Sequence, residues 1–149
     1  MEKNTGKNKL SIAILFGGCS TEYEVSLQSA YSVITHLNQE KYNAHLIGIT
    51  REGTWLRYEG DIDRIPEDIL RAGGLELIHL DAVFPVLHGK NGEDGTVQGL
   101  CELAGLPVVG CGMEASVLGM DKHLAHTLVS LDGIEVPASV LFRRMPSEA

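Results

Sequence analysis

The sequence is short of cysteine and of long apolar runs, and each shortage argues against a class of protein. Its three cysteines, Cys19, Cys101 and Cys111, form no CxxC pair and no even-numbered set, so a reduced, cytosolic setting is predicted. No run approaches the roughly 18 apolar residues that a membrane span needs. The start, "MEKNTGKNK", is polar, and the apolar stretch after it is too short for a signal peptide.

Positive charge is also scarce. The chain has 12 basic and 20 acidic residues, and its net charge at pH 7 is −8. Nucleic acid is therefore disfavoured as the main partner, because contact with a phosphate backbone needs a basic face. A single nucleotide is not excluded, since it needs only a few local donors. With 44% hydrophobic residues in a chain of 149, we expect a folded domain with its own core.

Several catalytic motifs are absent. The glycine turn "GGCSTE" (17–22) lacks the GxGxxG pattern, and no acidic residue ends the next apolar run, which disfavours a nucleotide-dependent oxidoreductase. No Gly-Lys-Ser/Thr marks a P-loop, and no GxSxG marks a serine hydrolase. His123 and His126 are three residues apart, without a carboxylate that would complete a zinc motif. No metal ligand is therefore predicted.

Apolar patterning predicts strands and helices in alternation. A continuous apolar run, typical of a strand buried on both faces, occupies 10–16, and further strands are predicted at 43–50, 81–89 and 106–110. Helical spacing of apolar residues occurs at 22–38, 95–104, 114–119 and 121–132. We further expect a hairpin-like turn within 51–58, a short helix at 66–72, and a strand or extended segment at 134–144. Gly105 and Gly133 are predicted to end two of the helices.

This order of elements predicts an α/β fold, with an open, mostly parallel sheet flanked by helices. Ligands of such sheets bind beyond the carboxyl ends of the strands. Two of the predicted strand ends, 17–24 and 88–95, carry an unusual density of polar and charged residues. We therefore expect these two segments to form the functional site.

The first segment carries two glutamates behind its glycines. Thr21 and Glu24 fit the Thr-x-x-Glu capping box of a helix start, which would account for Glu24. Glu22 is left without that explanation. Either it stabilises the positive end of the helix dipole, or it projects over the strand ends and pairs with a cationic group such as a substrate amine.

The second segment, "LHGKNGEDGT" (87–96), places His88 where an apolar run stops. It is either a polar loop with a hydrogen-bonded histidine or the point where an imidazole meets a substrate oxygen. Glu93 and Asp94 would then orient His88 or brace the first segment.

A third polar feature lies at a predicted helix start, where Asp121 is expected to be the N-cap. Lys122 follows in the first turn, where a cation is unfavourable for the helix dipole. It is therefore either a solvated surface lysine or a residue that faces a phosphate.

Three motifs, taken together, closely resemble one family. They are "FGGCSTEYEVSLQSA" (16–30), "VFPVLHGKNGEDGTVQGLCELAGLPVVGCG" (83–112) and "MDKHLAHTLVS" (120–130). In this order and spacing they resemble the amino-terminal part of D-alanine–D-alanine ligases, which are ATP-grasp enzymes. "GITREGTW" (48–55) is particularly similar to the vancomycin-resistance branch, which makes D-alanyl-D-serine or D-alanyl-D-lactate. The resemblance covers almost all of the chain except about 59–80.

The resemblance implies a cytoplasmic enzyme that joins two D-amino acids for peptidoglycan precursors. In the family, ATP phosphorylates the carboxylate of the first D-alanine, and the amine of the second residue attacks the acyl phosphate. The resemblance assigns catalytic roles to Glu22, which would hold the first substrate's ammonium, to His88 and to Ser26. It assigns Val25 and Gly89 to the substrate site.

For the cofactor, the resemblance implies that Lys122 reaches ATP. It also implies a Rossmann-like, pre-ATP-grasp domain over 1–125 and the start of an ATP-grasp domain over 126–149. The family's magnesium ligands, its glycine-rich phosphate loop and its oxyanion-stabilising arginine have no counterpart in these residues.

The resemblance further implies a homodimer. It leaves the second substrate open between D-alanine, D-serine and D-lactate, with D-serine favoured, because selectivity in the family depends largely on residues past position 149. The alternative function is a non-catalytic α/β module that only binds a ligand.

Residues 1–149 alone are expected to show no ligase turnover. Metal clamping and oxyanion stabilisation usually supply the largest share of catalysis in such chemistry, and the family's groups for both lie outside these residues. A coupled ATPase assay with D-alanine measures this directly. Turnover comparable to that of a complete ligase would contradict the prediction.

Overall fold

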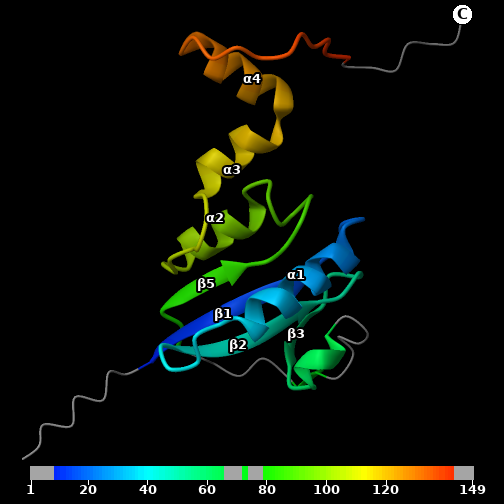
Figure 1. Ribbon diagram of the computed structural model, residues 1–149, viewed down its shortest axis with the longest axis vertical. Helices are drawn as coiled ribbons and strands as arrows, with labels where there is room; N and C mark the ends of the chain where they lie inside the picture. Colours follow the sequence, from blue (N-terminus) through cyan, green and yellow to red (C-terminus); the bar gives the residue numbers. More distant parts are fainter. Residues whose placement is uncertain (1–8, 66–71, 74–78, 143–149) are drawn as a thin grey trace, which may run out of the picture.

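The structure is a computed structural model that describes residues 9–65, 72–73 and 79–142. Its elements, shown in Figure 1, are β1 (Leu10–Gly17), α1 (Tyr23–Thr35), β2 (Tyr42–Ile49), β3 (Trp55–Tyr58), the 3₁₀ helix η1 (Ile62–Arg64), β4 (Ala72–Gly73), β5 (Ala82–Pro85), α2 (Thr96–Leu103), α3 (Met113–Met120) and α4 (Lys122–Leu131). The sheet and α1 form the lower part of that view, and α2, α3 and α4 follow one another away from it.

The described strands form one sheet in the order β4-β3-β2-β1-β5. β1 is parallel to β2 on one side and to β5 on the other, while β2–β3 and β3–β4 are antiparallel. The predicted α/β class is confirmed, and so is the hairpin-like turn, which joins β2 to β3. Because β1, β2 and β5 run in parallel, their carboxyl ends lie at the same edge of the sheet.

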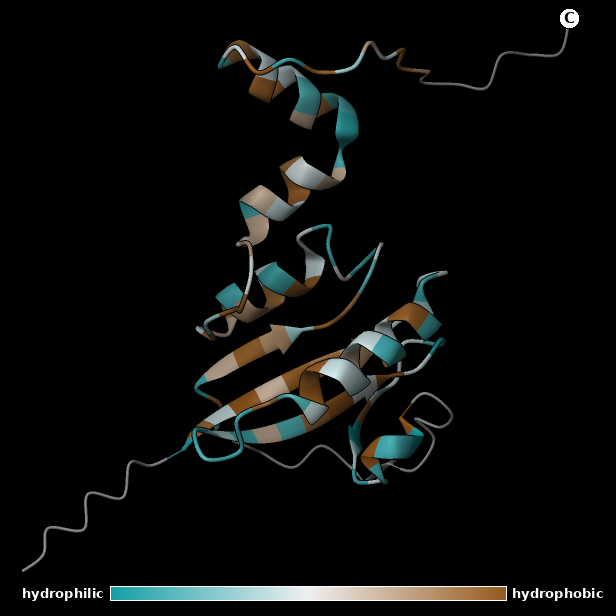
Figure 2. Cartoon of the chain, in the orientation of Figure 1, coloured by the Kyte–Doolittle hydropathy of each residue, from teal (hydrophilic) through white to brown (hydrophobic). Residues whose placement is uncertain are grey.

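β1 is buried on both faces, as its uninterrupted apolar run predicts. Its side chains alternate between the faces. One set packs with Leu27, Ala30 and Ile34 of α1, and the other packs near Val97 and Cys101 of α2. Figure 2 shows this concentration of hydrophobic residues in the strands. The domain therefore has two core clusters, one on each side of the sheet.

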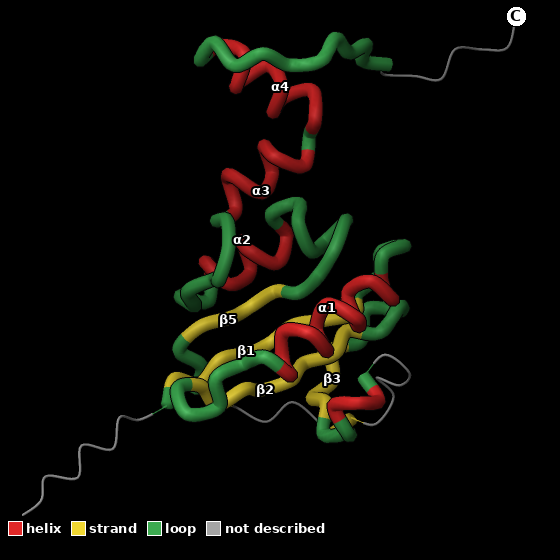
Figure 3. The backbone as a smooth tube through the Cα atoms, viewed as in Figure 1, coloured by secondary structure: helices red, strands yellow, loops and turns green. Residues whose placement is uncertain are grey.

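Two predicted strands are shorter than expected. The run at 81–89 forms a strand only as far as Pro85, although the Val86 N–H still donates to the Leu15 carbonyl of β1. The strand predicted at 106–110 is wrong: Val108 makes a single parallel bridge to Val83, and the flanking residues are loop (Figure 3). Pro107 supplies only its carbonyl, to the Val83 N–H.

The last segment was expected to be a strand or an extended segment. Its described part, 134–142, forms no strand (Figure 3), which leaves the second of these alternatives. The short helix expected at 66–72 falls outside the described residues, apart from Ala72, which lies in β4. The expected domain boundary between 125 and 126 falls inside α4.

No helix in the described ranges is both long and apolar enough to cross a membrane.

Helix ends were predicted with mixed success. The capping box is wrong, because the N-cap of α1 is Glu22 and no side chain caps that helix; Thr21 stands outside the helix in the preceding turn. Asp121 is the N-cap of α4, as predicted, and its carboxylate accepts hydrogen bonds from two backbone N–H groups. Gly105 and Gly133 follow α2 and α4 with the positive φ angles expected of helix-ending glycines.

Ser26 of α1 ties the ends of two strands together. Its side chain is completely buried. Its hydroxyl accepts a hydrogen bond from the Gly17 N–H at 2.8 Å and donates one to the Val86 carbonyl at 2.5 Å. Gly17 ends β1 and Val86 follows β5, so this hydroxyl holds the starts of the two following loops beside each other.

Replacing this hydroxyl should destabilise the fold. Ser26→Ala leaves a buried N–H and a buried carbonyl without partners, which costs about 2–6 kcal/mol for the two groups. The free energy of unfolding in urea is the measurement. Ser32→Ala, at an exposed position of the same helix, is the control and should change it by less than about 0.5 kcal/mol. Equal effects of the two substitutions would contradict the role given to Ser26.

Candidate active site

The loop after β1 is joined to the loop after β5 by one serine. Gly17 and Gly18 have positive φ angles of 88° and 102°, which let the chain leave the sheet sharply. Ser20 then donates from its hydroxyl to the His88 carbonyl at 2.8 Å and accepts from the Glu22 N–H at 3.1 Å. The two segments singled out in the sequence therefore meet.

Glu22 packs against the backbone of the second loop. A Cβ atom at Gly89 would lie 2.7 Å from Glu22 Oε2, and Gly89 also has a positive φ of 68°. The positive φ favours glycine at this position. Glu22 is exposed, and among the described residues it has no cationic partner. Its carboxylate thus lies beside Gly89, the residue after His88, and remains open to a ligand.

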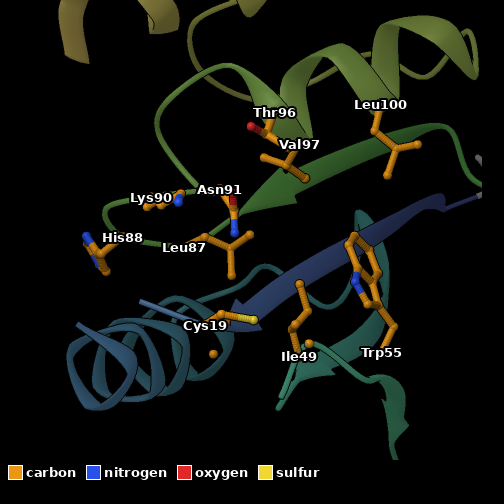
Figure 4. A pocket seen from close by; sticks show the side chains of 14 residues that line it. Cys19, Ile49, Trp55, Leu87, His88, Lys90, Asn91, Thr96, Val97 and Leu100 are labelled. Carbon is orange, nitrogen blue, oxygen red and sulfur yellow. The ribbon is translucent and has the colours of Figure 1, made fainter. Parts of the chain in front are cut away.

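His88 lies half-buried beside α1. Its Nε2 is 3.2 Å from Ser29 Oγ, and its carbonyl accepts the Ser20 hydroxyl. No described residue hydrogen-bonds its Nδ1. Figure 4 shows the imidazole pointing away from the apolar side chains drawn around it. The second ring nitrogen is therefore the atom left for a ligand.

Val25 and Ser26 are neighbours on α1, but Val25 is exposed and Ser26 is buried. Val25 is 51% exposed on the first turn of α1, three residues after Glu22, where it is accessible to a ligand held by that carboxylate. Ser26, for which a catalytic role was expected, is fully buried, and both of its hydrogen-bonding functions are used within the fold. We therefore treat Ser26 as a positioning residue.

Glu93 and Asp94 brace their own loop, and not His88 or the first loop as expected. Glu93 accepts a hydrogen bond from the Gly89 N–H at 2.6 Å. Asp94 accepts from the N–H groups of Asn91 and Thr96 at 2.9 and 3.1 Å. The bond from the Asn91 backbone is the main reason that the pKa of Asp94 lies below its usual value. These bonds fix the shape of the loop that presents His88 and Gly89.

Glu24 has a surface partner that explains it without a cap. It forms an ion pair with Arg51, in the turn after β2. Arg51 also stacks over the Tyr23 ring, 4.2 Å from its centroid. The hydrogen bond from Arg51 lowers the pKa of Glu24. Of the two glutamates beside the glycine turn, Glu24 is therefore neutralised by a cation and Glu22 is not.

A cavity of about 490 Å³ brings His88 together with Lys122. It is lined by residues of α1, of the loop after β5, and of α2, α3 and the first turn of α4. Lys122 donates from Nζ to the Gly119 carbonyl at 3.1 Å and stays exposed; the carboxylate of Glu93 lines the same cavity, and its hydrogen-bond partner is the Gly89 N–H. A cation and an imidazole thus share one hollow, and the residue after that histidine, Gly89, is the one that Glu22 approaches.

Sequence reasoning missed Gln98, which also lines this cavity. It is only 7% exposed, and its Nε2 donates to the Gly92 carbonyl at 2.9 Å. Its Oε1 has no partner within the described chain. The available signal was a polar residue between Val97 and Cys101 on the apolar face of the predicted helix. Within the described ranges, no three His, Cys, Asp or Glu side chains are grouped to hold a metal ion.

The family is decided by a match to a family model. The model described as "D-ala D-ala ligase N-terminus" matches residues 11–72 and 69–111. This match covers well over half of the chain and includes Glu22, Val25, His88 and Gly89.

The chain belongs to the D-alanine–D-alanine ligase family.

Related proteins agree with this assignment to the ligase family. A D-alanine–D-alanine ligase of Caldicellulosiruptor bescii is 47% identical, over 85% of this chain and 40% of its own length. The crystal structure of the VanG D-Ala:D-Ser ligase from Enterococcus faecalis matches with a TM-score of 0.84 at 49% identity, over 91% of this chain and 46% of that one. A Bacillus anthracis D-alanine–D-alanine ligase complexed with ATP matches with a TM-score of 0.67 at 29% identity, over 94% of this chain and 42% of that one.

The family resemblance seen in the sequence is confirmed, and so is the fold that it implied. The chain spans less than half the length of these ligases. Lys122 lies outside the residues that the family model matches, although the structure places it in the same cavity as His88.

The loop that presents His88 should depend on the charge of Asp94. The pKa of Asp94 in the folded protein lies below its usual 3.8, so its stabilisation is complete well above that pH and disappears as the pH falls through the folded pKa. Asp94→Asn should therefore lower the urea midpoint at pH 7, and the difference from the unmodified protein should shrink below pH 3.8. Asp132→Asn, at an exposed position after α4, is the control. A difference that persists unchanged at low pH would contradict the prediction.

Proposed function

We propose that this chain is the amino-terminal, substrate-binding part of an ATP-dependent ligase that joins D-alanine to a second D-amino acid. The observation that supports this most directly is the arrangement around Gly89. There an unpaired carboxylate, Glu22, packs against the residue that follows His88. A free amino acid is a zwitterion, so it needs a negative group for its ammonium and a donor for its carboxylate. These two side chains supply both.

In this proposal Glu22 binds the ammonium of the first D-alanine through charge-assisted hydrogen bonds. His88 donates from Nδ1 to an oxygen of the substrate's carboxylate, while Ser29 holds Nε2 and so fixes the plane of the ring. Val25 covers the small side chain from the first turn of α1. The result is a fixed orientation of the carboxylate towards the cavity that Lys122 lines.

ATP, when bound, would supply the phosphoryl group that activates this carboxylate. Lys122 fits a phosphate because its ammonium lies at the wall of the cavity with only a carbonyl as partner. A magnesium site is not provided by the described residues, and we assign Mg²⁺ binding to parts of the longer ligases that have no counterpart here. The proposed ligase acts where ATP is available, in the cytoplasm, and as a homodimer.

For the second substrate we propose D-serine, with D-alanine as the alternative. The 49% identity to the VanG D-Ala:D-Ser ligase supports this choice. Comparing dipeptide formation from D-alanine alone with that from D-alanine plus D-serine, in the complete ligase, decides between them. Exclusive formation of D-alanyl-D-alanine would overturn the D-serine assignment without affecting the proposed role of Glu22.

Glu22→Gln, made in a ligase of the relatives' full length that contains this chain, tests the site. Loss of the charge removes a charge-assisted bond worth about 1.5–3 kcal/mol, so KM for the first D-alanine should rise at least about tenfold. Phosphate release at varied D-alanine concentration is the measurement.

Glu24→Gln is the matched control, because this carboxylate lies two residues away and is paired with Arg51. It should change KM by less than about twofold, as expected for a surface ion pair. A Glu22 variant that binds D-alanine normally, or a Glu24 variant that fails equally, would overturn the assignment.

A further inference from the structure

A second cavity, of about 440 Å³, lies beyond the carboxyl ends of β1 and β2. Its walls include Ile49, Leu87 and Val97, which belong to the core cluster on the α2 side of the sheet. The zwitterion site described above lies on the side of α1. This cavity therefore adjoins that site and extends from it over the other face of the sheet, and Leu87, His88 and Gly92 line both cavities.

The walls of this second cavity are apolar on three sides, as Figure 4 shows. Val97 and Leu100 come from α2, Ile49 from the end of β2, and Trp55 from the start of β3. Leu100 is 52% exposed and Trp55 is half-buried, so both present apolar surface to the hollow. Sites for small organic molecules have this volume and this apolar character.

The turn between β2 and β3 forms the part of the cavity wall that lies beside Cys19. Gly53 has a positive φ of 87°, and a Cβ atom there would lie 3.3 Å from Cys19 Sγ. A larger residue would therefore press on the thiol, which Figure 4 shows directed into the cavity. The glycine leaves this space open.

The polar rim of the cavity carries positive charge only. Lys90 and Asn91 lie on the rim above Leu87 in Figure 4, and the Asn91 amide points inward. No described carboxylate pairs with Lys90, and none of the 14 residues that line the cavity is acidic. Although the chain has a net charge of −8, the rim of this cavity favours an anion.

We propose that this cavity is a second ligand site, which binds a small molecule with a planar apolar body and a single anionic group. The body lies between Trp55 and the α2 side chains Val97 and Leu100, and the anion lies at Lys90 and Asn91. D-Alanine does not fit this description, because it is too small to contact these walls and its ammonium would have no carboxylate to meet.

Trp55 makes the site testable, since it is the only tryptophan in the chain. The probe is 8-anilinonaphthalene-1-sulfonate, which combines aromatic rings with one sulfonate. Titration with excitation of Trp55 should give saturable energy transfer to one bound probe. Lys90→Ala should raise the dissociation constant at least fivefold, and Lys90→Arg should keep it within twofold. Lys41→Ala, which removes an exposed lysine beside the opposite end of β2, should have no effect.

A second readout separates this cavity from the exposed apolar surface of α3 and α4, which also attracts this probe. In a Cys111→Ser background, the accessible thiol of the described chain is Cys19, because Cys101 is buried. Saturating probe should slow the reaction of Cys19 with a thiol reagent at least fivefold. If Cys19 reacts at an unchanged rate, or if Lys90→Ala binds the probe as the unmodified chain does, the probe is elsewhere and the proposal is overturned.

Discussion

The hydroxyl of Ser26 is the interaction on which the rest of the site depends. It donates a hydrogen bond to the Val86 carbonyl and accepts one from the Gly17 N–H. Ser26 is completely buried. It thereby fixes α1, the end of β1 and the end of β5 relative to one another. Every later contact between the two loops, including the Ser20 bond to the His88 carbonyl, presupposes this alignment.

Acidic side chains crowd this edge of the sheet, and the fold gives nearly all of them a partner. Glu24 is paired with Arg51, while Glu93 and Asp94 accept backbone N–H groups of their own loop. Of these carboxylates, Glu22 is the one for which no described residue supplies a cation or a hydrogen-bond donor. A single uncompensated carboxylate can select an ammonium group, whereas a cluster of free carboxylates would attract cations of any kind.

The segment 87–92 contributes to both faces of the molecule. Towards α1 it presents His88, and with α3 and α4 it closes the cavity that contains Lys122. Towards α2 it presents Leu87 and Asn91 to an apolar cavity. The two hollows share one short stretch of chain and differ in their other walls, which are Ile49, Trp55 and Leu100 in one and residues of α3 with Lys122 in the other. This is the geometry expected where parallel strands end and the chain turns outward.

The sequence by itself determined the α/β class, most element positions and the residues at the two loops, because apolar periodicity and glycine positions are local properties. The same local rules misassigned Glu24. They predicted a capping box, but the carboxylate binds Arg51, which is distant in the sequence and so is not part of a four-residue motif. They also missed the buried Gln98, and they could not show that the Ser26 hydroxyl is occupied by the fold. Those outcomes depend on which groups the sheet brings within 3 Å of each other, and only the tertiary structure decided that.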